Sequence, residues 1–146
     1  MRQFVPSRDA NPIGRSTTSR RAVVDAPGKT QGEIEAAVCD VVRHLEMQFT
    51  GREPGEVRAH LIGDLIVARA RGVLTVAERR LVASACPDRG SDLLKLARTS
   101  LIESVRPLVK AVVEDITDVE MVSLYYDICG VADEEVFILG LAAPPA

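Results

Sequence analysis

The sequence predicts an α+β fold: a four-stranded, mainly antiparallel sheet with helices packed on one face, in the order α-β-β-α-α-β-β. Three observations predict it. The stretch from Glu56 to Thr75 reads as two strands joined at Gly63-Asp64, a Gly-first pair typical of a type II′ hairpin. Helical periodicity flanks this stretch on both sides. A second pair of strand-like segments, ending at Leu141, closes the chain.

The first helix is predicted to begin after Thr30, because Glu33 three residues later completes a capping box. Apolar residues then recur at three- and four-residue steps, which indicates an amphipathic helix. They are Ile34, Val38, Val41, Leu45 and Phe49. Gly51 suits the left-handed position that ends such a helix. The charged residues between them, Glu46 among them, are expected largely on the opposite face.

The hairpin is predicted to have one apolar face and one charged face. Val57, Ala59 and Leu61 alternate with more polar neighbours in its first strand. The arginines of both strands fall at least in part on the other face, together with His60; they are Arg58, Arg69 and Arg71. This alternation fits an antiparallel sheet that helices cover on one side only.

Two helices are expected between the strand pairs. Thr75 and Glu78 form a second capping box, which predicts a short helix to about residue 85. Pro87 and Gly90 interrupt the pattern, so the long helix is expected over about residues 92–116. The residues of its predicted buried stripe are Leu94, Ala97, Leu101, Val105, Leu108, Val112 and Ile116.

Within this long helix, Pro107 predicts a kink, since an interior proline removes a hydrogen bond and clashes with the preceding turn. The charged side chains Arg98, Glu103, Arg106, Lys110 and Glu114 are expected to be helix-surface neighbours that form ion pairs. A sharper alternative is that Arg106, beside the proline, points inward to a carboxylate such as Asp127.

The last two strands are predicted over residues 119–128 and 134–141, with a turn through residues 129–133 between them. These boundaries divide the chain into a disordered basic arm (1–29), a single α+β domain (30–143) and a short tail (144–146). Six basic and two acidic residues fall in the arm, whereas acidic residues outnumber basic ones in the rest of the chain. The arm is expected to be a solvated tail, with contact to an anionic surface as the alternative.

Composition excludes several classes of protein. No apolar run approaches the roughly 20 residues that span a bilayer, so direct membrane insertion is not expected. An odd number of cysteines without a signal peptide favours a reducing compartment, which predicts a cytoplasmic protein. Aromatic residues make up 3% of the chain and the domain is acidic, which argues against a nucleic-acid partner.

Chemical motifs are scarce. His44, His60 and the three cysteines lack any metal-ligand spacing, and no glycine-rich phosphate loop is present, so no metal and no cofactor are expected. Cys86 before Pro87 is the best candidate nucleophile because a helix N-terminus lowers thiol pKa values, but an inert thiol is the simpler interpretation. The arginines of the hairpin could form an anion-binding face, a dimer interface or a solvated surface.

Several stretches in a particular order resemble the MpsC-like family, named for a component of a bacterial Na⁺-translocating membrane-potential-generating system. The stretches are GREPGEVRA (51–59), Gly63-Asp64, GVLTVAE (72–78) and RPL (106–108). The resemblance covers about residues 29–128. It implies a soluble bacterial domain that works with a membrane complex, and it supplies no catalytic residues. Tyr125-Tyr126-Asp127 departs from the family pattern.

The resemblance leads to an expected function. The chain is expected to be a non-enzymatic accessory component of a membrane-potential-generating or Na⁺-transport system, cytoplasmic or peripheral to the inner face of the cell membrane, with membrane transport subunits as partners. It is also expected to be a homo-oligomer, because an open four-stranded sheet leaves edges that proteins usually cover. The alternative is a regulatory domain that binds a small molecule or anion through Arg58, Arg69, Arg71 or Arg106, with Asp127 as a further binding residue.

Overall fold

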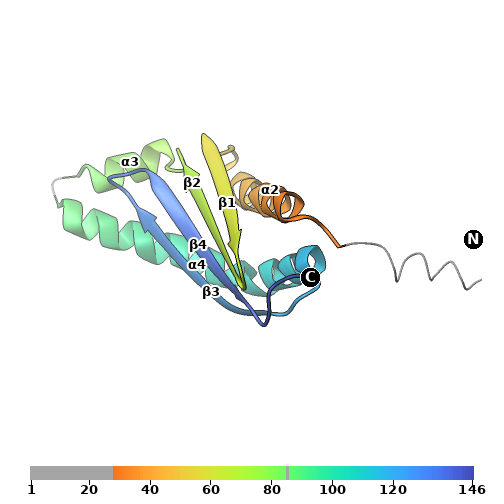
Figure 1. Ribbon diagram of the computed structural model, residues 1–146. Coiled ribbons are helices and arrows are strands. Elements are labelled where there is room, and N and C mark those ends of the chain that lie inside the picture. The colour runs from red at the N-terminus through yellow and green to blue at the C-terminus, as the bar shows by residue number, and fades with distance from the viewer. Residues whose placement is uncertain (1–27, 85) are drawn as a thin grey trace, which may run out of the picture.

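A computed structural model gives the structure of residues 28–84 and 86–146. It confirms the predicted α+β fold and the predicted order of elements (Figure 1). The helices are α2 (Gln31–Thr50), α3 (Val76–Val82) and α4 (Pro87–Thr117). The strands are β1 (Glu56–Ile62), β2 (Leu65–Arg71), β3 (Met121–Cys129) and β4 (Glu134–Leu141). The predicted disordered arm falls almost wholly outside these residues.

The four strands form one sheet in the order β1-β2-β4-β3, and every neighbouring pair is antiparallel. The last strand of the chain therefore inserts between the hairpin and β3. Helix α2 packs against β1 and β2, α4 packs against β3, and α3 packs against α4. Figure 1 shows strands in front of α4 and α2 beside β1. Side chains of α2 and α4 pack on the same face of the sheet, where they meet Ala68, Phe137 and Leu139. The opposite face of the sheet has no helix of the described residues over it.

The hairpin turn follows the sequence prediction. Gly63 has a φ angle of 62°, whereas Asp64 is outside the positive-φ region. Positive φ at the first central residue alone defines the type II′ turn, whose twist matches that of the flanking strands. The caps of α2 are also as predicted, because Thr30 and Glu33 form a capping box and Gly51 adopts the left-handed conformation with φ 75°.

The predicted start of the long helix is wrong. α4 begins at Pro87 rather than near Asp92, because proline at the first helical position loses no intrahelical hydrogen bond. Gly90 lies inside the helix, where a Cβ atom would stand 2.0 Å from the carbonyl oxygen of Leu81. Gly90 therefore permits α3 to approach α4 closely. Pro107 also lies inside α4, which continues to Thr117.

The predicted buried stripe of α4 is partly wrong. Leu94 is buried as expected, but Ala97, Leu101 and Leu108 are exposed. The fully buried positions are Leu94, Arg98, Ile102, Val109, Val113 and Thr117. Both sets of positions obey the three- and four-residue spacing of a helix, so periodicity alone does not choose between them. The correct stripe passes through an arginine, which the sequence interpretation had assigned to the surface.

Helix side chains cover parts of both edges of the sheet. On β1, the amide of Leu61 donates to Glu35 Oε2 at 2.8 Å and its carbonyl accepts from Gln31 Nε2 at 3.2 Å, both on α2. On β3, the carbonyl of Leu124 accepts from Arg106 Nη2 at 3.2 Å. Groups that would pair with a further strand are thus already bonded, which is one way proteins protect sheet edges.

Candidate functional site

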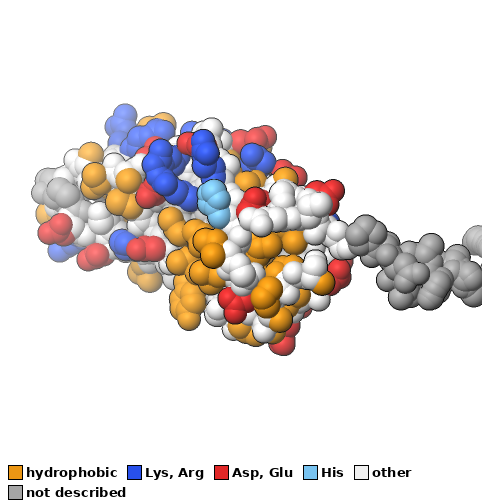
Figure 2. Space-filling view, in the orientation of Figure 1, with side chains coloured by type: hydrophobic (Ala, Val, Ile, Leu, Met, Phe, Trp, Pro, Cys, Tyr) orange, Lys and Arg blue, Asp and Glu red, His pale blue; other side chains and the backbone are white. Residues whose placement is uncertain are grey.

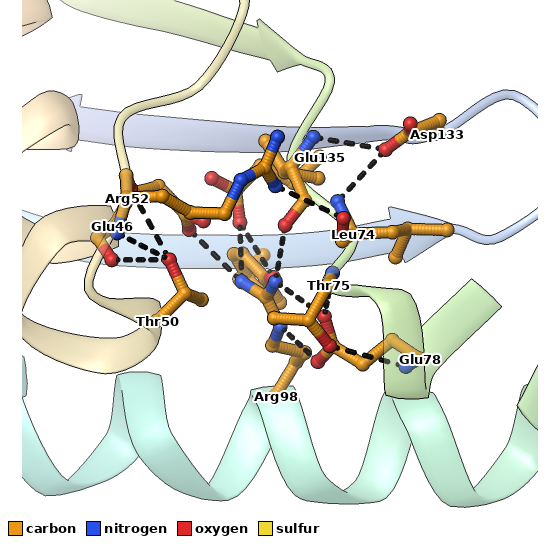
Figure 3. A network of polar contacts seen from close by, with 11 residues as sticks. Glu46, Thr50, Arg52, Leu74, Thr75, Glu78, Arg98, Asp133 and Glu135 are labelled. Carbon is orange, nitrogen blue, oxygen red and sulfur yellow. Dashed lines mark hydrogen bonds and ion pairs between the residues drawn. The ribbon is translucent and has the colours of Figure 1, made fainter. Parts of the chain in front are cut away.

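The guanidinium of Arg98, on α4, is the centre of a buried ionic network (Figure 3). Its side chain is 2% exposed. Nε and Nη2 donate to the two carboxylate oxygens of Glu78 at 2.7 and 2.9 Å. Nη1 donates to Glu46 Oε2 at 2.9 Å, and Nη2 also donates to the carbonyl oxygen of Val73 at 2.8 Å. Such a bidentate, multiply bonded geometry is what a buried arginine needs to offset its loss of hydration.

Glu135, on β4, adds a second acid to this network. Its side chain is 0% exposed, and Oε1 lies 3.6 Å from Arg98 Nη1 and accepts from the hydroxyl of Tyr126 at 2.7 Å. Burial, together with the hydrogen bond to Glu46 and its charge, raises the pKa of Glu135 to about 9. The other oxygen, Oε2, accepts no hydrogen bond, which fits an oxygen that bears the proton. The direction of this pKa shift and the unbonded Oε2 both favour a proton on Glu135.

We call Glu46, Glu78, Arg98 and Glu135 the Arg98 centre. Hydrogen bonds hold the loop after β2 next to the Arg98 centre. The amides of Val73 and Leu74 donate to Asp133 Oδ1 at 2.8 and 2.9 Å, and the carbonyl of Leu74 accepts from Arg52 Nη1 at 3.0 Å. Arg52 belongs to the stretch GREPGEVRA, and the loop to GVLTVAE. Two of the stretches that carry the family resemblance thus meet at this centre.

Sequence reasoning missed the Arg98 centre. Glu46 was assigned to the polar face of the first helix but is 1% exposed, and Arg98 was assigned to surface ion pairs. The signal that could have revealed the burial of Arg98 is its spacing from apolar residues of the same helix. Arg98 lies four residues from both Leu94 and Ile102, so a stripe through it would have been visible had a charged residue been admitted to the core.

The sheet face that points away from the helices carries the predicted arginines; we call it the open face. The register arranges its side chains in four rows across β1, β2, β4 and β3. The first row is Ile62, Leu65, Gly140 and Ser123, and the second row is His60, Val67, Ile138 and Tyr125. The third row is Arg58, Arg69, Val136 and Asp127, and the fourth row is Glu56, Arg71, Glu134 and Cys129. Figure 2 shows basic side chains gathered on one part of the surface, with a histidine between them and a hydrophobic area.

The three arginines of the hairpin do lie together. With Glu56 they line a hollow of about 280 Å³. Each is already paired: Arg58 Nε lies 2.5 Å from Glu56 Oε2, and Glu134 Oε1 accepts from Nε of Arg69 at 2.9 Å and of Arg71 at 3.4 Å. One carboxylate thus serves two arginines, which leaves the hollow with an excess of positive charge.

Arg106 and Asp127 are not partners, so that alternative is wrong. Arg106 Nη2 pairs with Glu103 Oε2 at 2.7 Å on the same helix, as expected for helix-surface neighbours. Asp127 lies on the open face, where Lys95 Nζ pairs with its Oδ1 at 2.7 Å and this hydrogen bond lowers its pKa. The two residues are held apart because each finds a closer charge on or beside α4. Arg106 therefore does not join the arginines of the open face.

The remaining candidates lie apart from the open face or do not form a cluster. Cys86 is exposed at the N-cap of α4, where its side chain makes no capping hydrogen bond. His44 lines an apolar hollow of about 400 Å³ between α2 and α4, with Leu108 and Val112 on the other wall. Within residues 28–84 and 86–146, no three His, Cys, Asp or Glu residues are grouped so as to hold a metal ion. No helix in these ranges is long and apolar enough to cross a membrane.

The fold and these two regions define a small α+β domain with a sealed arginine–carboxylate centre on one side of its sheet and an open, charged face on the other. The chain belongs to the family described as "Na+-translocating membrane potential-generating system (MpsC)", whose model matches residues 30–143. It is 26% identical over 113 residues to the uncharacterized protein YbcI of Bacillus subtilis (strain 168), across 77% of this chain and 89% of that protein. No solved structure matches.

Proposed function

We propose that this chain is a non-enzymatic accessory component of a bacterial membrane-potential-generating or Na⁺-transport system, which acts from the cytoplasmic side by binding other protein subunits. The observation that carries the proposal is the match to the MpsC family model across residues 30–143. The family description names such a system, and the matched range includes every helix and strand described here.

The open face supports a binding role. Ile62, Val122 and Tyr125 are each at least 60% exposed although they belong to strands of a sheet. Exposed apolar side chains on the same face as charged ones are typical of protein interaction surfaces. We propose that the chain self-associates through this face. The edges expected earlier to drive association are less suitable, since α2 and α4 side chains bond to them.

The test is a pull-down of the tagged chain from gently solubilised membranes of its own host, read by mass spectrometry. The tag alone and the chain without residues 1–29 are run in parallel. Enrichment of an ion-transport subunit over the tag-alone sample is the expected result, and its loss on truncation assigns docking to the arm. Recovery of only the chain itself contradicts the accessory role.

A second candidate function is anion binding by a regulatory domain. The hollow lined by Arg58, Arg69 and Arg71 favours it, because guanidinium groups bind phosphate and carboxylate groups well. Titration with inorganic phosphate, followed by the backbone amide NMR signals of β1 and β2, tests it. Saturable shifts that Arg69→Gln abolishes would support this function, whereas shifts no larger than those of sodium chloride would exclude phosphate as the ligand.

A further inference from the structure

The four rows of the open face show a property that composition does not reveal: opposite halves of the face are complementary. On the β1–β2 half, three arginines stand with a single acid, Glu56. On the β4–β3 half, Glu134 and Asp127 are acidic and the strands contribute no basic residue. The strands therefore make one half basic and the other acidic, although Lys95 of α4 pairs with Asp127 on the acidic half.

The uncharged rows are complementary as well. In the first row, the large side chains of Ile62 and Leu65 lie on the β1–β2 half, whereas Gly140 and Ser123 on the other half are small, with the exposed Val122 beside Gly140 where the β3 register shifts. In the second row, the two central positions, Val67 and Ile138, are both apolar. Large side chains opposite small ones and apolar ones opposite each other are the conditions for close packing of two sheets.

We propose that two copies of this chain stack open face to open face, about a two-fold axis that runs parallel to the strands between β2 and β4. This inference rests on the self-association part of the proposed function and specifies its geometry. Such an axis places β1 of one copy over β3 of the other and β2 over β4, and it keeps each row aligned with itself. A two-fold contact of this kind is closed, so it yields a dimer and not a filament.

The axis places an arginine opposite an acid in each of the two charged rows, although Arg69 faces Val136 of the second copy. Arg58 faces Asp127 of the second copy, and Arg71 faces Glu134 of the second copy. Val67 faces Ile138 of the second copy near the axis. Sheets that pack face to face lie about 10 Å apart, a gap that arginine and carboxylate side chains bridge from opposite sides.

The other in-plane two-fold axis, perpendicular to the strands, is less favourable. It reverses the order of the rows, so that Arg69 faces Val67 of the second copy and Arg71 faces Leu65. No arginine would then face an acid of the second copy, whereas about the first axis two of the three do, so the desolvation of the arginines would not be offset by an opposite charge. Pairing through a sheet edge would displace the hydrogen bonds from Gln31, Glu35 and Arg106.

The test is a charge-reversal cycle followed by sedimentation velocity over a range of concentrations. Arg58→Asp and Asp127→Arg are prepared singly and together, and circular dichroism checks that each variant is folded. Each single change places like charges opposite each other and is expected to weaken the dimer at least about tenfold. The double variant restores the opposite pairing, so its dissociation constant returns toward that of the wild type. Arg80→Asp, an equal charge change on exposed α3, is the control and leaves the dimer intact.

The outcomes separate this geometry from the broader proposal. A wild-type chain that stays monomeric up to about 1 mM, the range of very weak binding, overturns self-association and leaves the open face to another partner. A dimer whose double variant is no tighter than the single variants overturns only the geometry. Neither result bears on whether an ion-transport subunit is recovered from membranes, which the pull-down reads independently.

Discussion

The domain holds two arginine–carboxylate clusters, one on each side of its sheet, and they differ in what surrounds them. At the Arg98 centre, one guanidinium makes hydrogen bonds to two carboxylates and a carbonyl, and its side chain is 2% exposed. On the open face, Arg58 is 70% exposed and pairs with Glu56. The same residue types therefore serve different purposes.

The difference follows from hydration. A buried ion pair is held in place because removal of one partner leaves a desolvated charge, so the Arg98 centre couples α2, α3, α4 and β4 into one folded unit. An exposed pair contributes little to stability because water competes for both partners. Its charges remain available to a second surface. The sealed centre serves folding, and the open face is suited to association.

The largest expected effect is that of Arg98→Met. This substitution keeps most of the side-chain volume but leaves Glu46 and Glu78 without their cation, so it should lower the free energy of unfolding by about 3–5 kcal/mol. Urea unfolding followed by circular dichroism measures it. A loss below about 1 kcal/mol would show that the Arg98 centre does not couple these elements of the fold.

Glu135→Gln is expected to change how stability depends on pH. The pKa of Glu135 is about 9 in the folded state against an ordinary value of 4.5, so the folded chain binds the extra proton between these values. The stabilisation that this proton gives to the folded chain is complete below pH 4.5. As the pH rises toward 9 it is lost, and the free energy of unfolding falls by at most about 1.4 kcal/mol per pH unit. Glutamine keeps a donor and an acceptor without titrating, which removes this loss.

Urea unfolding of both proteins from pH 5 to pH 9 checks this prediction. The wild type should lose stability relative to Glu135→Gln as the pH rises. Burial acts to raise the pKa of Glu78, but the hydrogen bonds that it accepts from Arg98 and from the Thr75 amide together lower it. The stability that ionised Glu78 provides is lost only as the pH falls below about 4.5, which is outside this window. Parallel profiles for the two proteins would mean that Glu135 is ionised.

Arg106→Ala should have the smallest effect, although Arg106 lies on the same helix as Arg98. Its side chain is 38% exposed and pairs with Glu103, which is also exposed, so the loss should stay within about 1 kcal/mol. Both variants remove a guanidinium group from α4, and the two guanidinium groups differ chiefly in burial. A loss comparable to that of Arg98→Met would show that the hydrogen bond from Arg106 to Leu124 matters more than burial.

The fold was largely predictable because its signals are local. Capping boxes at Thr30 and Thr75 and the Gly63-Asp64 turn specify where elements begin and reverse, and alternation specifies which strand face is apolar. The same alternation placed Arg58, Arg69 and Arg71 on one face. These features depend on residues a few positions apart, so sequence reasoning reaches them.

The Arg98 centre was not predictable in this way. Its members are contributed by α2, α3, α4 and β4, and Glu46 lies 52 residues from Arg98. A charged residue is ordinarily exposed, and only the presence of three partners from distant segments makes burial of Arg98 affordable. The order of the strands in the sheet was not predictable either, because β4 inserts between β2 and β3 without any local sequence signal. The complementarity of the open face depends on that order and was hidden for the same reason.

Sedimentation velocity of Val67→Asp beside the wild type tests whether the chain associates through its open face. Val67 lies on the open face, next to the proposed two-fold axis and away from the Arg98 centre. The wild type is expected to sediment as a dimer, whereas Val67→Asp, with an unpaired charge facing Ile138 of the second copy, is expected to sediment as a folded monomer. A variant that remains folded and has the same mass as a dimeric wild type would contradict the assignment of association to the open face.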